Sequence, residues 1–188
     1  MDENPHHLIL GRCIDFLSGK TIPDTHDEQY RQKLAKHLVL TLGYEKSEIQ
    51  QNREILIQTG GQAAKIHVDF LVSQNSHVDM LVKYAPGSLV TRRLSNLALS
   101  RIITPYQIPV VVTTNGEDAE VVSGFTGKVF GQGLEAIPGP DHPVWESFSR
   151  PLDKISPDLF EKASRIAFAC EVDGACPCDT NVCRLEDG

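Results

Sequence analysis

The sequence predicts an α/β fold with a mixed β-sheet and helices on its faces. Two adjacent segments, 64–72 and His77–Tyr84, alternate between apolar and polar residues, which is typical of half-buried strands. A continuous β-branched run at 108–113 is typical of a strand buried on both faces. Helical segments precede and separate these strands, and this order indicates one α/β unit.

The N-terminal part predicts two helices. A semi-apolar stretch favours a short helix over residues 8–16. A second helix begins near Thr25, because Thr25 and Glu28 have the spacing of a capping box. Gly43 is a good residue to end this helix. Its buried stripe recurs every fourth residue, at Tyr30, Leu34, Leu38 and Leu42.

A meander of three strands follows. Residues 53–58 form the first strand, and Gly60-Gly61 makes the turn into the segment 64–72. On the polar face of the two alternating segments we place Lys65, His67 and Asp69 from the first, and His77, Asp79, Leu81 and Lys83 from the second. Two His and two Asp on one face also leave a transition-metal site open.

The next elements are a helix and three strands. The helix is expected over 90–103, between Pro86-Gly87 and Pro105. The buried strand at 108–113 leads through Asn115-Gly116, a strong tight-turn signal, to a strand over Ala119–Ser123. A short edge strand is expected at 127–130.

The C-terminal part has a different character. Residues 138–157 are rich in proline and predict a loop-like linker, followed by a last helix over 159–169 and a cysteine-rich tail. We therefore divide the chain into a domain at 1–137 with an N-terminal extension, and a unit at 138–188 of linker, helix and tail.

Composition limits the class of protein. The 188 residues carry a net charge of −7, which argues against binding duplex DNA through a broad basic surface. The acidic start does not have the pattern of a signal peptide, and no apolar run is long enough to cross a membrane. We expect a cytoplasmic protein with reduced thiols and no contact with the membrane.

The order of motifs resembles the N-terminal nuclease domain of type I restriction enzyme R subunits, a branch of the PD-(D/E)xK superfamily. The resemblance runs from Asp24 to about Ile137. It rests on Glu28-Gln29-Tyr30-Arg31, Leu42-Gly43-Tyr44, Val68-Asp69, Leu81-Val82-Lys83 and 112–116 (VTTNG). It implies a restriction-endonuclease-like sheet flanked by helices. The chain has no phosphate-binding loop of a motor domain.

The resemblance implies a metal-dependent site for cleaving DNA. In the family a strand Asp and the acid of an acid-x-Lys motif hold a divalent cation such as Mg²⁺, and the Lys stabilises the developing charge. The corresponding catalytic positions are Glu28, Asp69 and Lys83. Leu81 stands where the second acid belongs, and Asp79, two residues earlier on the same strand face, is the candidate substitute.

Because Leu81 replaces an acid of the family motif, two functional hypotheses remain open. One is a metal-dependent endonuclease whose activity is weak or lost, in which case Leu81→Glu is expected to raise the affinity for metal. The other is a non-catalytic module that binds nucleic acid or a partner protein. Arg92, Arg93 and Arg101 are candidate phosphate contacts, although a solvated helix face also explains them.

Four cysteines in the tail suggest a third function. Cys170, Cys176, Cys178 and Cys183 fall within fourteen residues and are a sufficient ligand set for structural zinc or an iron–sulfur cluster. Two disulfides or idle thiols are the alternatives.

Overall fold

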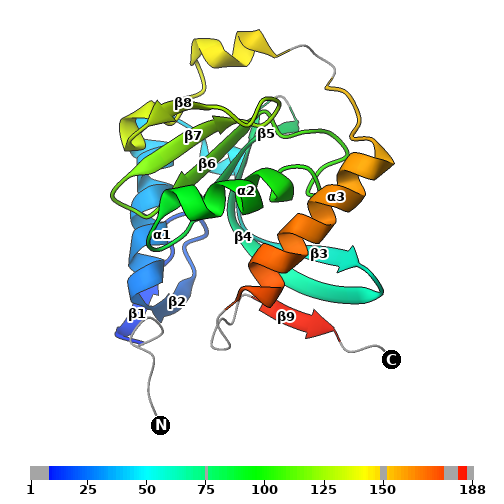
Figure 1. Ribbon diagram of the computed structural model, residues 1–188. Helices are drawn as coiled ribbons and strands as arrows, with labels where there is room; N and C mark the ends of the chain where they lie inside the picture. Colours follow the sequence, from blue (N-terminus) through cyan, green and yellow to red (C-terminus); the bar gives the residue numbers. More distant parts are fainter. Residues whose placement is uncertain (1–8, 75, 149–151, 176–181, 186–188) are drawn as a thin grey trace.

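The computed structural model describes residues 9–74, 76–148, 152–175 and 182–185. A seven-stranded mixed sheet forms its centre (Figure 1). Neighbouring strands run antiparallel except β5 and β6, which are parallel and joined through a helix. The predicted α/β class with a mixed sheet is confirmed. In spatial order the strands are β3 (Ile49–Thr59), β4 (Gln62–Gln74), β5 (His77–Tyr84), β6 (Val110–Thr114), β7 (Ala119–Ser123) and β8 (Val129–Gln132), with β9 (Val182–Leu185) also paired to β4.

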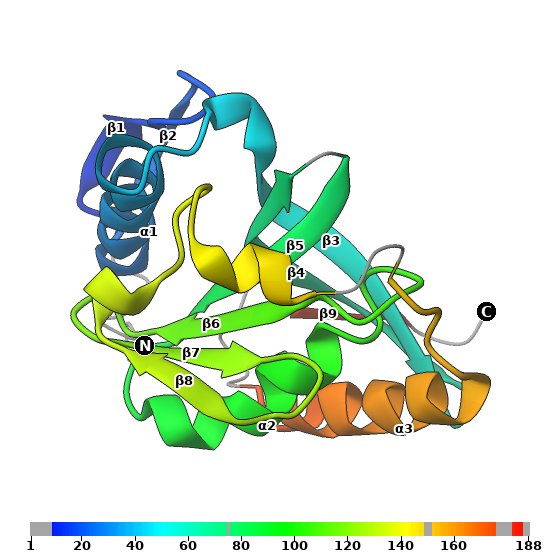
Figure 2. The same ribbon diagram turned by 90° about the horizontal axis from the view of Figure 1, so that it is seen from above.

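Helices cover both faces of the sheet. α1 (His26–Lys36), continued by the wider turns of η2 (His37–Thr41), lies on one face. α2 (Leu89–Leu99) and α3 (Pro157–Ala167) lie on the other face (Figure 2). Each face has its own apolar core: Leu38 of η2 packs with one set of strand residues, and Ala98 of α2 and Ala167 of α3 pack with the other.

Local sequence signals explain several of these elements. The Thr25 hydroxyl accepts a hydrogen bond from the Glu28 backbone N–H at 3.1 Å and caps α1, as predicted. Gly60 and Gly61 have φ values of 57° and 81°, which allow a two-residue turn between β3 and β4. Asn52 of β3 also has a positive φ, 51°, and lies opposite Asp69 between two flanking strand pairs.

Two expectations about local structure are wrong. Residues 8–16 were expected to form a helix, but the described part forms a hairpin of β1 (Gly11–Ile14) and β2 (Thr21–Asp24). β5 is not half-buried: its Asp79, Met80, Leu81 and Val82 are all buried. The reason is position, because β5 lies between β4 and β6 and has helices over both faces.

The C-terminal elements pack onto the same sheet as the rest. α3 lies beside α2, and the short η6 (Phe168–Asp173) continues it. β9 pairs with β4 from Ala63↔Leu185 to Ile66↔Val182. β5 pairs with the same strand only from Phe70↔Val82 onward. Along β4, residues 67–69 therefore lie between the stretch that pairs with β9 and the stretch that pairs with β5.

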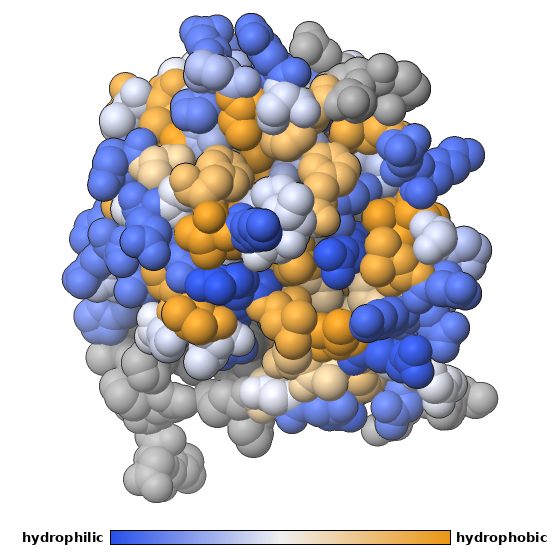
Figure 3. All heavy atoms as spheres, turned by 45° about the horizontal axis from the view of Figure 1, so that its top comes forward, coloured by the Kyte–Doolittle hydropathy of each residue, from blue (hydrophilic) through white to orange (hydrophobic). Residues whose placement is uncertain are grey.

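The surface carries apolar side chains in separate patches. On the face seen in Figure 3, hydrophilic side chains break the apolar surface into small areas. One aromatic group joins Phe125, Trp145 and Phe148, with ring centroids 5.6 and 6.2 Å from that of Phe148. Within the described part of the chain, no helix is long and apolar enough to cross a membrane.

Candidate functional site

A cavity of about 780 Å³ opens beside residues 67–69 of β4. Asp69 of β4 and Lys83 of β5 both line it, and Glu28 of α1 lines it from the side. The strands that carry Asp69 and Lys83 are adjacent and antiparallel, as the alternating pattern predicts. The structure therefore brings together the three residues that match the motif, although their catalytic role stays a prediction.

Both oxygens of the Asp69 carboxylate already have donors. Arg31 Nε donates to Oδ1 at 2.6 Å, and the backbone N–H of Tyr84 donates to Oδ2 at 2.8 Å. The Asp69 side chain is only 8% exposed. Although burial opposes the charge of Arg31, the pair with Asp69 raises the pKa of the guanidinium overall. Asp69 and Arg31 thus form a charge-assisted ion pair in the lining of the cavity.

Glu28 belongs to the same network on the α1 side. One carboxylate oxygen accepts a hydrogen bond from Gln32 Nε2 at 2.7 Å, and the other lies 3.8 Å from Arg31 Nη1. Asp27, also on α1, accepts a hydrogen bond from the Tyr84 hydroxyl at 3.2 Å. Burial, reinforced by Asp27, raises the pKa of Tyr84. The phenol therefore stays protonated and serves as a donor at neutral pH.

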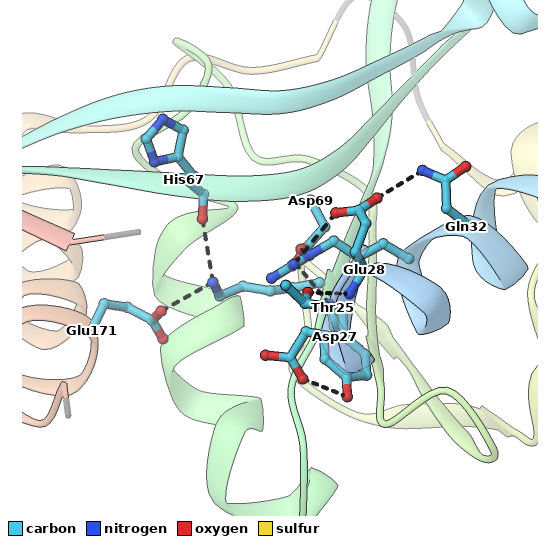
Figure 4. A network of polar contacts seen from close by, with 10 residues as sticks. Thr25, Asp27, Glu28, Gln32, His67, Asp69 and Glu171 are labelled. Carbon is cyan, nitrogen blue, oxygen red and sulfur yellow. Dashed lines mark hydrogen bonds and ion pairs between the residues drawn. The ribbon is translucent and has the colours of Figure 1, made fainter. Parts of the chain in front are cut away.

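Lys83 is held from the opposite side by the C-terminal helix. Its Nζ lies 3.2 Å from Glu171 of η6 and 3.4 Å from the backbone oxygen of His67. The other Glu171 oxygen accepts a hydrogen bond from the Ser95 hydroxyl of α2. Figure 4 shows Glu171 entering opposite Glu28, with Asp69 between them. Lys83 and Glu171 form a nearly buried ion pair, with side chains 14% and 8% exposed.

Leu81 and Asp79 do not belong to the cavity. Leu81 is fully buried in the core under α2 and α3, where it packs with residues such as Leu71 and Val111. Asp79 is 1% exposed, lies at a register shift between β4 and β5, and is not among the residues that line the cavity. The structure therefore does not bring Asp79 to Asp69 and Lys83.

The three candidate arginines have different surroundings. Arg92 lines the cavity and has no ion pair with any other described residue. Arg93 makes two hydrogen bonds to the Glu120 carboxylate, at 2.7 and 3.0 Å. Arg101 donates to Gln107 at 2.9 Å, and burial lowers the pKa of its guanidinium. Arg92 is the one of the three that lines the cavity, and phosphate contact by these arginines stays a prediction.

The structure describes two of the four cysteines of the tail. Cys176 and Cys178 lie outside the described residues. Cys170, on η6, lines the cavity, and burial raises the pKa of its thiol. Cys183, on β9, is exposed, and both of these tail cysteines, Cys170 and Cys183, are free thiols. The predicted zinc or iron–sulfur site at Cys170, Cys176, Cys178 and Cys183 stays a prediction.

Sequence reasoning missed two important residues of the cavity. Arg31 belongs to the quoted motif of the first helix, yet its pairing with Asp69 follows only from the way α1 crosses the sheet. No sequence pattern predicted that Glu171 pairs with Lys83, because 88 positions separate the two residues and no motif links them. A carboxylate thus stands beside Lys83 after all, but it comes from another element.

The residues of the cavity do not fit a magnesium ion as they are arranged. Mg²⁺ requires carboxylate oxygens that are free to coordinate it. Asp69 has donors on both oxygens, Leu81 has no ligand atom, and Glu171 is held by Lys83 and Ser95. Among the described residues, no group of three or more His, Cys, Asp or Glu side chains is placed to hold a metal.

Comparison with known families identifies the family of the chain. A family described as type I restriction enzyme R protein N terminus matches residues 26–138, which is more than half of the chain. The chain belongs to this family. The sheet is thus a restriction-endonuclease-like sheet, as the order of motifs predicted. Comparison with curated proteins and with solved structures gave no match.

Parts of this R-protein domain outside the family match complete the cavity. Asp15, Ser18 and Lys20 of the N-terminal hairpin region line one side. Cys170, Glu171 and Val182 of the C-terminal elements line another. The matched region supplies Asp69 and Lys83, whereas elements outside it supply the rest of these lining residues.

Proposed function

We propose that this R-protein N-terminal domain is a nuclease-related module that contacts DNA and in which metal-dependent phosphodiester hydrolysis is weak or lost. The observation that carries the proposal is the engagement of Asp69. Its two oxygens accept hydrogen bonds from Arg31 and from the Tyr84 backbone, and the second acid of the motif is replaced by the buried Leu81. Without a second strand carboxylate beside Asp69, the metal that supplies the main charge stabilisation in such sites is short of a ligand.

Contact with DNA is supported by the cations of the cavity. Lys83 and Arg92 line it, and Arg92 has no ion pair among the described residues. Because the whole chain carries a charge of −7, we expect such contact to be local and strongly dependent on salt. The cytoplasm stays our expectation for its compartment. A partner protein is the alternative ligand if no oligonucleotide binds.

A cleavage assay tests the loss of hydrolysis. Single-stranded and duplex oligonucleotides are incubated with the wild-type chain and Mg²⁺ or Mn²⁺, beside Asp69→Asn and Lys83→Gln as matched controls. We expect the wild type to release no more product than the two variants. Robust cutting that disappears in Asp69→Asn would mean that the site rearranges to hold a metal, and it would overturn the proposal.

Leu81→Glu tests whether the missing acid can simply be restored. The sequence alone suggests that it raises metal affinity, but burial of position 81 changes the expectation. A carboxylate there would lie in an apolar core, so we expect a loss of at least about 3 kcal/mol in unfolding free energy. Leu81→Met, the control, is expected to lose less than about 1.5 kcal/mol. Recovery of Leu81→Glu stability in millimolar Mg²⁺ would contradict this.

A further inference from the structure

Lys83 is covered by a segment that lies outside the family match. We define the C-terminal clasp as residues 168–175 and 182–185, which comprise η6 with its end and β9. The clasp contributes Glu171 to the cavity, where it pairs with Lys83 at 3.2 Å. The same carboxylate accepts a hydrogen bond from Ser95 of α2. Lys83, at the lysine position of the acid-x-Lys motif, is thus paired with a carboxylate from a segment outside the matched region.

The attachment of the clasp is uneven. The Lys83–Glu171 pair is nearly buried, so solvent and salt screen it little. The rest of the clasp is held to the domain by four residue pairs between β9 and β4, and by Phe168 and Val172, which pack in the core. The ion pair between Arg184 and Asp173, at 2.7 Å, joins two parts of the clasp to each other. Among the described residues, the ion pair that joins the clasp to the rest of the domain is the one between Glu171 and Lys83.

We propose that Glu171 is a built-in counter-ion that occupies the phosphate position of Lys83, and that single-stranded nucleic acid competes with it for this lysine. A carboxylate and a phosphate offer an ammonium group the same kind of acceptor oxygen. The inference rests on the proposed contact with DNA. It adds that the clasp limits this contact. We take the nucleic acid to be single-stranded, because the cavity of about 780 Å³ is the size of a small-ligand site and not of a duplex groove.

Glu171→Gln tests the competition. The variant keeps the shape of the side chain and removes its charge. The matched control is Glu161→Gln on α3, which removes the same charge from an exposed side chain paired with Arg165. Binding of a fluorescent single-stranded oligonucleotide is followed by anisotropy over a range of salt concentrations.

We expect Glu171→Gln to bind about tenfold more tightly than Glu161→Gln, the effect of one charged hydrogen bond. Its salt slope should be steeper by about 0.7, as for one more phosphate neutralised on a single strand. In a Lys83→Gln background Glu171→Gln should have no effect. Equal affinities for the two charge variants, or a gain that persists without Lys83, would overturn the proposal.

Hydrogen exchange provides a readout that does not depend on DNA. Exchange in 168–175 and 182–185 should be faster in Glu171→Gln than in Glu161→Gln, and oligonucleotide should speed the same amides in the wild type. If the clasp loosens but no variant binds the oligonucleotide, nucleic acid is not the competing ligand and the inference fails. Cleavage by the wild type would instead overturn the proposed loss of hydrolysis and leave the competition intact.

Discussion

At the scale of single residues, the site is defined by ion pairs rather than by free carboxylates. Asp69 is paired with Arg31, and Lys83 with Glu171, so each motif residue has a partner of opposite charge. Charges this poorly exposed are stable only when they are paired. The two pairs therefore hold α1 and η6 against the sheet, in addition to any role toward a ligand.

Asp69→Asn should destabilise the protein through Arg31. The substitution keeps the shape of the side chain but leaves the guanidinium, which is 25% exposed, with Glu28 at 3.8 Å in place of its close partner. We expect a loss of about 2 kcal/mol in the free energy of unfolding, below the range for fully buried pairs because Arg31 is partly solvated. Urea denaturation measures this change.

The control for Asp69→Asn is Glu54→Gln. Glu54 pairs with Lys65 on the same pair of strands, but the two side chains are 50% and 42% exposed. Such a surface pair is worth less than about 1 kcal/mol. If the two variants lose the same stability, the Asp69–Arg31 pair is no stronger than a surface pair and its structural role is refuted.

At the scale of elements, the Asp15 carboxylate links the N-terminal hairpin to the site. Asp15 is 2% exposed and accepts side-chain hydrogen bonds from Ser18, from Gln32 of α1 and from Gln51 of β3. Although burial opposes the charge, these hydrogen bonds lower the pKa of Asp15 to about 2. Gln32 also binds Glu28, so the hairpin and the α1 side of the cavity share one network.

The pKa of Asp15 predicts an acid dependence of stability. Because the folded pKa of about 2 lies below the usual 3.8, ionised Asp15 stabilises the fold above pH 3.8. This stabilisation, on the order of 2 kcal/mol, is lost as the pH falls through 2. Asp15→Asn should therefore be less stable than the wild type at pH 7 and nearly equal to it at pH 2. An unchanged difference between the two pH values would rule out this linkage.

The cysteine tail is an element whose order we propose to come from a metal. Cys170, Cys176, Cys178 and Cys183 should hold about one equivalent of zinc per chain in reduced protein, measured by elemental analysis. Visible absorption would indicate an iron–sulfur cluster instead. Cys170→Ser should lose the metal, whereas Cys13→Ser, a cysteine of β1, should keep it. Equal metal content in the two variants would exclude the tail as the site.

At the scale of the whole molecule, one sheet contains strands from both of the predicted units. β9 and α3 come from the C-terminal side of the predicted boundary at 137, yet β9 pairs with β4 and α3 packs beside α2. Apolar residues of α3, such as Ala163 and Ala167, share a core with the strands. Elements that share a core unfold together in small proteins.

Unfolding should therefore occur in a single transition. Trp145, the only tryptophan, lies C-terminal to the boundary and packs against a core made of residues from 1–137, so its fluorescence reports on the contact between the two parts. Far-ultraviolet circular dichroism reports on the helices and strands of the whole chain. We expect the two urea curves to coincide. Separate midpoints would show that 1–137 and 138–188 are independent units.

Local patterns were sufficient for much of the fold. The capping pair at Thr25, the Gly60-Gly61 turn and the alternation over His77–Tyr84 are short-range signals, and the structure bears out the element that each predicts. The hairpin of β1 and β2 escaped prediction, because a stretch this short and weakly apolar fits a helix as well as a strand.

By itself the sequence determined the α/β class, the family and the placement of Asp69 and Lys83 on adjacent strands. Only the tertiary structure decided that Leu81 is a core residue, that Arg31 forms an ion pair with Asp69 and that Glu171 forms one with Lys83. The physical reason is that alternation along a strand shows which residues share a face but not what covers that face. Contacts between residues far apart in sequence depend on how helices cross the sheet, which no local pattern encodes.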